Sequence, residues 1–521
     1  MRLLGLLVAP AVVLAFQIPF KVPFLKNKLD DDTTALPRIA IIGAGAGGSS
    51  AAFWISKAKE RFGLDLEVDV YESSSYIGGR STVVYPYDDP NSYSPVELGA
   101  SIFVAANRNL WRASEEFNLT RMQLGDDDAS MGVWDGKQLL VSVGGSWWDT
   151  LKLVWRYGIL SPKRTKNIVE QMVKQFLKFY TAESPRWDNI ADLAFSLGWT
   201  ELVSRNAADF LESRHIGKNY IREIVEASTR VNYGQNVDAI HALEGACSMA
   251  ATGAASIQGG NYQIFESFIH ASNASVYLDT TVKAITRKPY VSASQAWTVQ
   301  SDHGSKTYKV VILAAPFHST GITLSPSLAA QVPEQPYVHL HVTLLSTTSP
   351  SIDPEYLNLL PAATPPSMLL TTYEGARNGG KEPEFNSISY HGKISDDEWV
   401  VKIFSQDRKS DEWLQKVFRG QVGWIHRKEW DAYPVLPPTT AFPPVKLDAG
   451  FYYVNAFEPF ISTMETETIA SRNVVDLMLN EEFSSSICGP KISASSERQL
   501  SLGEYYFPSH YPDDFVLGWD C

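Results

Sequence analysis

The chain has 521 residues, of which 44% are hydrophobic and only 20% charged, and its formal net charge at pH 7 is −13. A chain of this length is too long for one simple core, so we expect a globular enzyme of two or three domains. The acidic balance and the lack of a basic cluster argue against nucleic acid as a partner.

The N-terminus predicts a signal peptide at residues 1–15. Arg2 supplies the positive charge, residues 3–16 are apolar, and Ala15 is a small residue at which cleavage can occur. The apolar run is shorter than the roughly 20 residues that span a bilayer. We therefore expect no transmembrane segment after the signal is removed. A membrane anchor is the alternative, and peripheral contact with a membrane stays open.

Glycosylation and cysteine usage fit a secretory protein. Acceptor sequences at Asn118 and Asn273 suit a route to the vacuole, the lysosome or the exterior. Three cysteines, Cys247, Cys488 and Cys521, are too few for a disulfide framework. Cys488 and Cys521 could pair within the C-terminal tail, but we expect them not to. The histidines are scattered without metal-ligand spacing, so we expect no metal site.

The strongest motif lies between Arg38 and Glu72. A short apolar run leads into Gly43-x-Gly45-x-x-Gly48, a helical stretch follows, and a second strand ends at Glu72. This context predicts a dinucleotide site, in which Gly43 permits a tight turn, Gly45 lets the backbone approach the pyrophosphate and Gly48 allows close helix–strand packing. The helix N-terminus would face the phosphates. Glu72 would accept the ribose hydroxyls, which favours NAD or FAD over NADP.

Two further segments favour FAD over NAD. Gly79 and Arg80 closely follow the ribose acid and suit a second loop over the pyrophosphate, where the Arg80 guanidinium would donate to phosphate oxygens. Gly99, Ala100 and Ser101 are the small residues needed where backbone lies against a flat ring. A surface ion pair is the alternative interpretation of Arg80.

The middle of the chain is first helical and then strand-rich. Residues 111–255 are mostly helical, with helices expected up to Tyr157 and over residues 168–180, where apolar residues recur at helical spacing. Residues 276–285 read as paired strands, in which Val282 offers its backbone to an adenine.

Further strands follow. Residues 308–316 predict a buried strand, and residues 331–440 combine alternating strand patterns with Pro-rich connections. His339-x-His341 is expected along one of these strands, which makes zinc an unsuitable ligand for the pair.

A closing helix is expected to begin at Met464-Glu465-Thr466. Its first backbone N–H groups would hold the flavin O2 and stabilise negative charge on the reduced ring. No cysteine or histidine lies in a tethering motif, so we expect non-covalent FAD. Residues 483–521 read as a Ser-rich, partly disordered C-terminal tail.

These patterns predict an α/β fold. A Rossmann-type FAD-binding domain would be assembled from discontinuous segments, with an inserted substrate domain made of helices and a β-sheet. The expected FAD-binding segments are residues 37–110, 256–330 and 441–482. The expected substrate-binding segments are residues 111–255 and 331–440.

Several spaced motifs resemble the prenylcysteine oxidases, also called prenylcysteine lyases, within the flavin amine oxidase superfamily. In chain order they are Leu153-Val-Trp-Arg-Tyr-Gly158, Arg230-Val-Asn232-Tyr233-Gly234-Gln235, Val401-Lys-Ile-Phe404-Ser-Gln406, and Ala432-Tyr-Pro434 followed by Pro437-Pro438. The similarity extends in the same order over most of the chain but not over the C-terminal tail.

The resemblance implies oxidative cleavage of the thioether in S-prenyl-cysteine. FAD would be the cofactor and O2 the acceptor, and the products would be cysteine, a prenyl aldehyde and hydrogen peroxide. Because the cofactor carries the difficult step, we assign no catalytic residue. The candidate substrate residues are Arg230, Asn232, Tyr233 and Gln235, of which Tyr233 and Gln235 would position the polar cysteine end or a water. Their alternative role is a turn that packs the domain interface.

Two other functions stay open. The first is a flavin amine or polyamine oxidase, which would usually carry a Gly-Asp or Gly-Glu pair before the closing helix, where this chain has Asn455-Ala456-Phe457. The second is a non-catalytic lipid-binding flavoprotein, against which the intact cofactor motifs argue.

Overall fold

The computed structural model describes residues 36–123, 130–144, 147–288, 296–489 and 514–521. The expected signal peptide therefore lies outside the described residues. Pro37–Cys521 forms one compact unit, which contains all the helices and strands named here. Within the described residues, no helix combines the length and the apolar character needed to cross a membrane.

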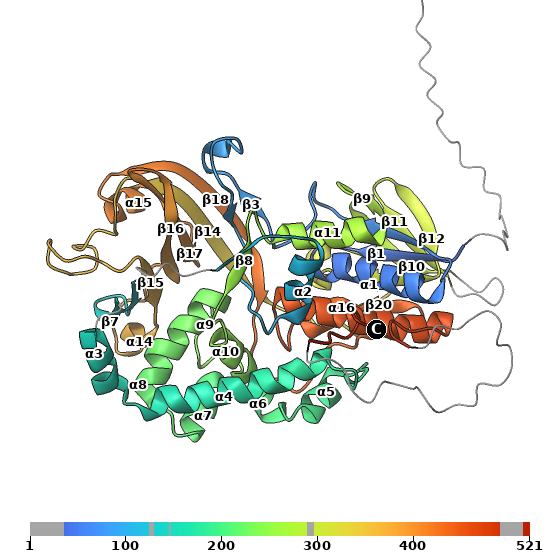
Figure 1. The fold of residues 1–521 in the computed structure, drawn as a ribbon, viewed down its shortest axis with the longest axis horizontal. Helices are drawn as coiled ribbons and strands as arrows, with labels where there is room; N and C mark the ends of the chain where they lie inside the picture. The colour runs from blue at the N-terminus through green and yellow to red at the C-terminus, as the bar shows by residue number, and fades with distance from the viewer. Residues whose placement is uncertain (1–35, 124–129, 145–146, 289–295, 490–513) are drawn as a thin grey trace, which may run out of the picture. The chain divides into compact units, whose positions relative to one another are not determined.

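A six-stranded sheet lies at the centre of the nucleotide-binding part (Figure 1). Its strands, in spatial order, are β19 (Lys446–Asp448), β20 (Phe451–Tyr453), β13 (Val310–Leu313), β1 (Arg38–Ile42), β2 (Glu67–Tyr71) and β9 (Ser275–Tyr277). β1 pairs in parallel with both β2 and β13. Ile39–Ile42 and Val310–Leu313 are buried along their whole length, as expected for parallel strands covered on both faces.

Helix α1 (Ala46–Phe62) follows β1 directly and packs against α11 (Tyr262–Ser272) and α16 (Met464–Phe483). Beside this sheet, β10 (Val282–Arg287), β11 (Trp297–Ser301) and β12 (Gly304–Tyr308) form a three-stranded antiparallel sheet. Residues 276–285 contribute to two strands, as expected, but these strands do not pair with each other, because β9 pairs with β2 and β10 pairs with β11.

A seven-stranded sheet forms the second part of the unit. Its spatial order is β18 (Val422–Pro434), β14 (Tyr337–Thr347), β17 (Glu398–Ser405), β16 (Ser387–Ser395), β15 (Met368–Thr371), β6 (Met131–Trp134) and β7 (Leu139–Val143). The expected strand at His339-x-His341 is confirmed as part of β14. Helix α9 (Glu226–Tyr233) packs against β15 and joins this sheet to the helical segment.

The helical segment begins with α3 (Trp147–Tyr157) and α4 (Leu160–Phe176), which confirms the two helices expected there. The other helices are α2 (Arg108–Glu116), α5 (Ile190–Ser196), α6 (Thr200–Ser204), α7 (Ala207–Ser213), α8 (Lys218–Tyr220), α10 (Ala242–Ser248), α12 (Phe317–Thr320), α13 (Pro326–Ala329), α14 (Glu374–Arg377) and α15 (Asp411–Val417). Single-turn segments are η1 (Pro86–Asp88), η2 (Leu177–Tyr180), η3 (Ile221–Val225) and η4 (Val454–Phe457), and two short pairs are β3 (Val83–Val84) with β4 (Val96–Glu97) and β5 (Arg121–Gln123) with β8 (Ala255–Ile257).

The sheets draw on the expected domain segments. All six strands of the first sheet come from residues 37–110, 256–330 and 441–482, and all seven strands of the second come from residues 111–255 and 331–440. The division into two domains stays a prediction, because Pro37–Cys521 is one compact unit.

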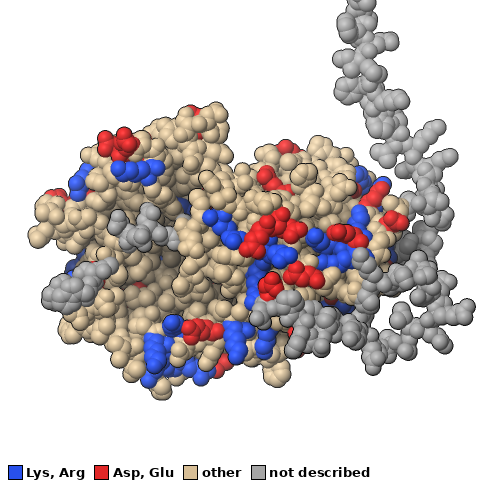
Figure 2. Space-filling model, in the orientation of Figure 1, with Lys and Arg blue, Asp and Glu red and all other residues tan. Residues whose placement is uncertain are grey.

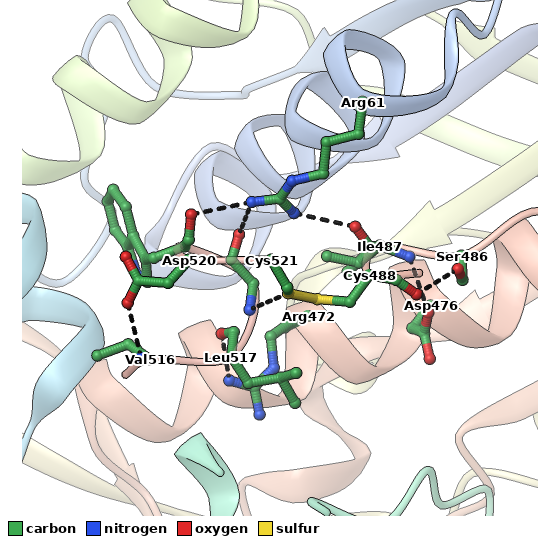
Figure 3. The surroundings of a disulfide bond; sticks show 12 residues. Arg61, Arg472, Asp476, Ser486, Ile487, Cys488, Val516, Leu517, Asp520 and Cys521 are labelled. Carbon is green, nitrogen blue, oxygen red and sulfur yellow. Dashed lines mark hydrogen bonds between the residues drawn. A yellow bond between two sulfur atoms is a disulfide. The ribbon is translucent and has the colours of Figure 1, made fainter. Parts of the chain in front are cut away.

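The end of the chain differs from the expected tail. Residues 514–521 return to the body, where the Trp519 ring packs on Phe53 and Trp54 of α1, with ring centroids 4.9 and 5.5 Å away. Cys488 and Cys521 form a disulfide, so the expectation that they stay unpaired is wrong. Arg61 of α1 lies between the joined segments and donates to the carbonyl oxygens of Ile487, Gly518 and Trp519 (Figure 3). The hydrogen bonds of Arg61 join positions 426 to 458 residues apart, so the sequence pattern did not show them. The disulfide itself joins positions 33 residues apart.

We predict that Cys521→Ser lowers the free energy of unfolding by about 2–4 kcal/mol, since the bridge restricts a long loop in the unfolded chain. Urea titration of the wild type and the variant under oxidising conditions measures this loss in the free energy of unfolding. Cys488→Ser is the matched control, and the double variant should cost no more than either single change. A double variant as stable as the wild type would contradict the disulfide.

Candidate cofactor site

A cavity of about 540 Å³ opens at the carboxyl ends of β1 and β2, where an α/β sheet is expected to bind its ligand. Its lining residues include the β1–α1 turn, the end of β2, the segments 78–81, 98–100, 280–282 and 314–322, residues of the strands β14, β17 and β18, Asn455 and Glu458, and the start of α16. The cavity therefore lies between the first sheet and the edge of the second.

The three glycines of the first turn have different roles. A Cβ on Gly43 would lie 2.5 Å from the Ala314 carbonyl oxygen, and its φ of +102° disfavours any side chain. A Cβ on Gly48 would lie 1.8 Å from the Gly43 carbonyl oxygen, so Gly48 allows the helix to pack on the turn. A Cβ on Gly45 would meet only the Gly79 Cα, at 3.8 Å. Gly45 lines the cavity, so the room it leaves serves a ligand.

Glu72 directly follows β2 and lines the cavity. Its Oε2 accepts a hydrogen bond from the Ala44 N–H, and its Oε1 accepts one from the Ser74 N–H, both at 2.8 Å. A carboxylate has about four acceptor positions. The group is thus held in place with acceptor capacity left for ribose hydroxyls. Val282, at the start of β10, also lines the cavity.

Gly79 and Arg80 line the cavity, but the Arg80 guanidinium is already engaged. Its Nη1 donates to the Ala432 carbonyl oxygen at 2.9 Å, and its Nη2 pairs with Glu458. Burial disfavours the charged form of Arg80, but the Glu458 carboxylate outweighs burial and raises the pKa of the guanidinium. The alternative of a surface ion pair is wrong, because Glu458 is buried. The role of Arg80 toward a phosphate stays a prediction.

The segment after β4 fits the expectation only in part. Gly99 and Ala100 line the cavity, and a Cβ on Gly99 would lie 2.0 Å from the Arg80 carbonyl oxygen. Ser101 is not among the lining residues. Its Oγ donates to the Gly99 carbonyl oxygen at 2.7 Å and accepts from the Lys402 Nζ at 2.9 Å. Ser101 therefore supports the backbone behind the wall, and its contact with the ring stays a prediction.

Lys402 belongs to a buried charged pair behind that wall. Burial raises the pKa of Glu97 to about 7, although the Asn261 N–H donates to its carboxylate at 2.6 Å. Burial lowers the pKa of Lys402 to about 8, and the charge of Glu97 opposes that shift. Lys402 thereby joins β17 to the Ser101 side chain, and Glu97 joins β4 to the Asn261 backbone.

Helix α16 begins at Met464, as expected, with Thr463 as its N-cap. Among the described residues, the backbone N–H groups of Met464 and Glu465 have no hydrogen-bond acceptor. Met464 lines the cavity, whereas the side chains of Glu465 and Thr466 turn away from it. Glu465 accepts from the N–H groups that begin α2, at Asn109 and Leu110, and Thr466 completes the capping box. The helix start is thus available to a ligand through its backbone.

Three buried polar atoms in the cavity wall lack a partner within the described residues: the Ser81 Oγ, the Asn455 Oδ1 and the Glu467 Oε1. Buried polar groups are almost always hydrogen-bonded, so these atoms indicate a polar ligand. FAD carries hydroxyl and N–H donors along its length, and the residues present therefore fit it. None of the three was predicted from the sequence, although Ser81 directly follows Arg80 and Glu467 directly follows Thr466.

The wall formed by the second sheet is apolar and aromatic. It presents Tyr337, Leu340, Phe404, Trp430 and Tyr433. Phe404 and Tyr433 belong to the motifs that carry the family resemblance. A wall of this kind excludes water and suits an apolar ligand group next to the cofactor.

The comparisons with known proteins identify the family. The model of the prenylcysteine lyase family matches residues 142–487, which is more than half of the chain. The chain belongs to the prenylcysteine lyase family. A model of the NAD(P)-binding Rossmann-like domain matches residues 41–117, which confirms the dinucleotide-binding motif.

Curated relatives cover nearly the whole chain. Farnesylcysteine lyase of Arabidopsis thaliana is 29% identical over 499 residues, 91% of this chain and 93% of the relative. Prenylcysteine oxidase 1 of Homo sapiens is 27% identical over 464 residues, 84% of this chain and 87% of the relative.

Solved structures confirm the predicted α/β fold class. Putrescine oxidase with bound putrescine matches with a TM-score of 0.57 at 13% identity, over 85% of this chain and 99% of that chain. A putative protoporphyrinogen oxidase from Exiguobacterium matches with a TM-score of 0.55 at 14% identity, over 86% of this chain and 100% of that chain. At these identities the likeness concerns the fold alone.

The four motif residues proposed for substrate do not line the cavity. Arg230 donates to Thr371, Asn236 and Asn386, and Asn232 donates to the carbonyl oxygens of Ser228 and Ser248. Gln235 donates to the Pro434 carbonyl oxygen and accepts from the Leu436 N–H. Tyr233 packs edge-on against the cavity residue Tyr433. In this family member they form the interface that supports the wall, and their direct contact with substrate stays a prediction.

The expectation of no metal site stays a prediction. His339, His341 and Glu429 offer ligand atoms within 4.8 Å of one another on β14 and β18. Both imidazoles already have carboxylate neighbours across the strand pair, Asp431 for His339 at 3.1 Å and Glu429 for His341 at 3.5 Å.

We predict that Gly45→Val abolishes cofactor retention and leaves the fold intact. The new side chain would enter the cavity while its Cβ keeps ordinary contact with Gly79. The measurement is flavin absorbance together with the far-UV circular dichroism spectrum of the purified protein. A yellow Gly45→Val protein would place the pyrophosphate elsewhere. Gly48→Ala is the contrasting control, and it should destabilise the fold itself.

A second prediction concerns acid stability. His241 caps α10, its Nδ1 accepts the Glu244 N–H, and its Nε2 therefore carries the proton that faces the Pro459 carbonyl oxygen. Burial lowers the pKa of His241 to about 4. The unfolded state thus binds more protons than the folded state between about pH 6.5 and pH 4, and stability is lost as the pH falls through this window.

His241→Asn retains a capping side chain and removes this titration. Between pH 7 and pH 4 the variant should gain up to about 3 kcal/mol in stability relative to the wild type. Urea unfolding of both proteins at the two pH values measures the difference. Burial raises the pKa of Glu244 to about 8, but that residue is present in both proteins and its effect cancels in the comparison. Parallel stability curves would show that His241 is not buried in its neutral form.

Proposed function

We propose that the protein is an FAD-dependent thioether oxidase that cleaves S-prenyl-L-cysteine, carrying a farnesyl or a geranylgeranyl chain. O2 and water would be consumed, and cysteine, a prenyl aldehyde and hydrogen peroxide would be released, as a step in degrading prenylated proteins. The family match over residues 142–487 carries the proposal. The names of the relatives, farnesylcysteine lyase and prenylcysteine oxidase, support the substrate class.

The reaction is balanced. The carbon between sulfur and the double bond loses a hydride, and water adds to it to give a hemithioacetal, which collapses to aldehyde and thiol. FAD, when bound, accepts the hydride and passes two electrons and protons to O2. The chain itself would bind the cofactor through the β1–α1 turn and Glu72. The N–H groups of Met464 and Glu465 are available to stabilise negative charge at the cavity.

The aromatic wall would hold the prenyl chain. Leu340, Phe404 and Trp430 are apolar lining residues on three strands of the second sheet. Each buried CH₂ group contributes about 0.8 kcal/mol, so a C15 or C20 chain supplies ample binding energy in such surroundings. This arrangement orients the reacting carbon and excludes bulk water without a dedicated acid or base.

A secretory location is part of the proposal. Asn118 and Asn273 both lie at the ends of helices and are exposed, as glycosylation would require. Together with the expected signal peptide they support the lysosome or vacuole, or secretion.

One observation favours an alternative function, that of an amine oxidase. The fold of the protein resembles that of putrescine oxidase. The two reactions differ in the bond cleaved, and both release peroxide. A flavin-containing lipid carrier would release none.

The test is peroxide release by the purified holoprotein with S-farnesyl-cysteine, spermine or putrescine. We expect turnover of S-farnesyl-cysteine and of neither amine, and farnesal and cysteine should appear in equal amounts. Peroxide from an amine alone would establish an amine oxidase, and no peroxide from any substrate would favour the carrier. Trp430→Ala should raise KM for S-farnesyl-cysteine by about tenfold through lost apolar burial, while His339→Ala, on the same strand pair outside the lining, should not.

A further inference from the structure

Helix α3 is attached to the protein by one face only. Tyr157 is buried, and its hydroxyl donates to Glu223 at 2.7 Å, while Arg156 forms an ion pair with the same carboxylate at 2.6 Å. Leu153 packs into the same cluster. These contacts fix the orientation of the helix.

The opposite face of α3, continued into the start of α4, is apolar and exposed. The side chains are Leu151, Val154, Trp155, Ile159 and Leu160, of which Trp155 is 89% exposed and Ile159 69%. Most of the other large hydrophobic residues exposed in the described part of the chain are scattered. Isolated exposed apolar residues need no explanation, but a contiguous group marks an interaction surface.

The charges around this face are basic, although the protein as a whole carries a net charge of −13. Lys152 lies among the apolar residues with 77% of its side chain exposed and pairs with Asp149 at 3.4 Å, and Lys166 on α4 pairs with Glu170 at 3.7 Å. These are the two acidic residues between positions 149 and 178, where the basic residues are Lys152, Arg156, Lys163, Arg164, Lys166, Lys174 and Lys178. In Figure 2, Lys and Arg gather along the lower edge of the view, in the region of α4 in Figure 1.

We propose that this surface, made of Leu151, Lys152, Val154, Trp155, Ile159 and Leu160, docks the protein on an anionic phospholipid membrane. Tryptophan and lysine together are favoured where a helix lies in the lipid headgroup region. Lysine is depleted at protein–protein interfaces, which makes a protein partner the poorer fit. Helix α3 has 11 residues, so it would lie on the membrane and not cross it.

The charge complementarity gives the surface a preference among lipids. Basic side chains near an anionic surface each add to the attraction, and the apolar side chains insert into the boundary of the acyl region. Binding should therefore require both groups of residues, and salt should weaken it.

The test uses the purified full-length holoprotein and sedimentation with vesicles. One set contains phosphatidylcholine alone and the other includes roughly a third phosphatidylserine. The wild type should bind the anionic vesicles more strongly. The double variant Trp155→Ser with Ile159→Ser should lower binding about tenfold. Lys152→Glu with Lys166→Glu should remove the preference for anionic lipid. Unfolding temperature and flavin absorbance should stay unchanged in all variants.

Phe195→Ser is the matched control. Phe195 is 79% exposed on α5, at the other end of α4 from α3 (Figure 1), so its loss should leave vesicle binding unchanged. The proposal fails if the wild type stays in the supernatant with both vesicles, or if the Trp155/Ile159 double variant binds like the wild type. It also fails if light scattering shows a dimer that this double variant dissociates, since a second copy would then occupy the surface.

Discussion

The contact between Gly48 on α1 and the Gly43 carbonyl oxygen is the constraint on which the rest of the site depends. A Cβ at Gly48 would come within 1.8 Å of that oxygen, so any side chain there would force the helix away from β1. With glycine present, α1 starts directly above the turn and its N-terminus points into the cavity. The backbone N–H groups of that helix start can then face a phosphate.

Helix α16 holds α1 from the other side. The Trp54 Nε1 donates to the Thr468 carbonyl oxygen at 3.1 Å, and the Ser471 Oγ donates to the Gly47 carbonyl oxygen at 2.5 Å. The N-terminus of α16 also lines the cavity. Helix α16 therefore both supports the β1–α1 turn and supplies a second set of backbone N–H donors, in addition to those at the start of α1. The C-terminal residues reinforce this pair through Trp519, which packs on α1 and so ties the end of the chain to the site.

The sequence predicted the parts of the site that depend on local backbone chemistry. Gly43, Gly45, Gly48 and Glu72 lie where expected because a turn, a helix start and a strand end are set within a few residues. The sequence does not show the side-chain contacts whose partners are distant in the chain. Ser101 accepts a hydrogen bond from Lys402 of β17, and the Glu465 carboxylate caps α2. The residues of the motif that begins at Arg230 likewise bind distant parts of the chain, at the interface between the second sheet and the helical segment. A family motif indicates that its residues are needed, but it does not show whether they contact substrate or another part of the protein.

The charge of the cavity shows why glycine was the informative residue. Arg80 is the one cationic side chain among the lining residues that the structure describes, and Glu72, Asp431, Glu458 and Glu467 are acidic. A pyrophosphate brings further negative charge, so side-chain charge alone would oppose FAD. Burial and the neighbouring Glu458 raise the pKa of Glu467 well above its usual range, which favours its neutral form and reduces the repulsion.

The remaining compensation comes from backbone N–H groups at the starts of α1 and α16. Recognition of the cofactor therefore rests on the path of the backbone, and glycines, not basic residues, mark that path in the sequence.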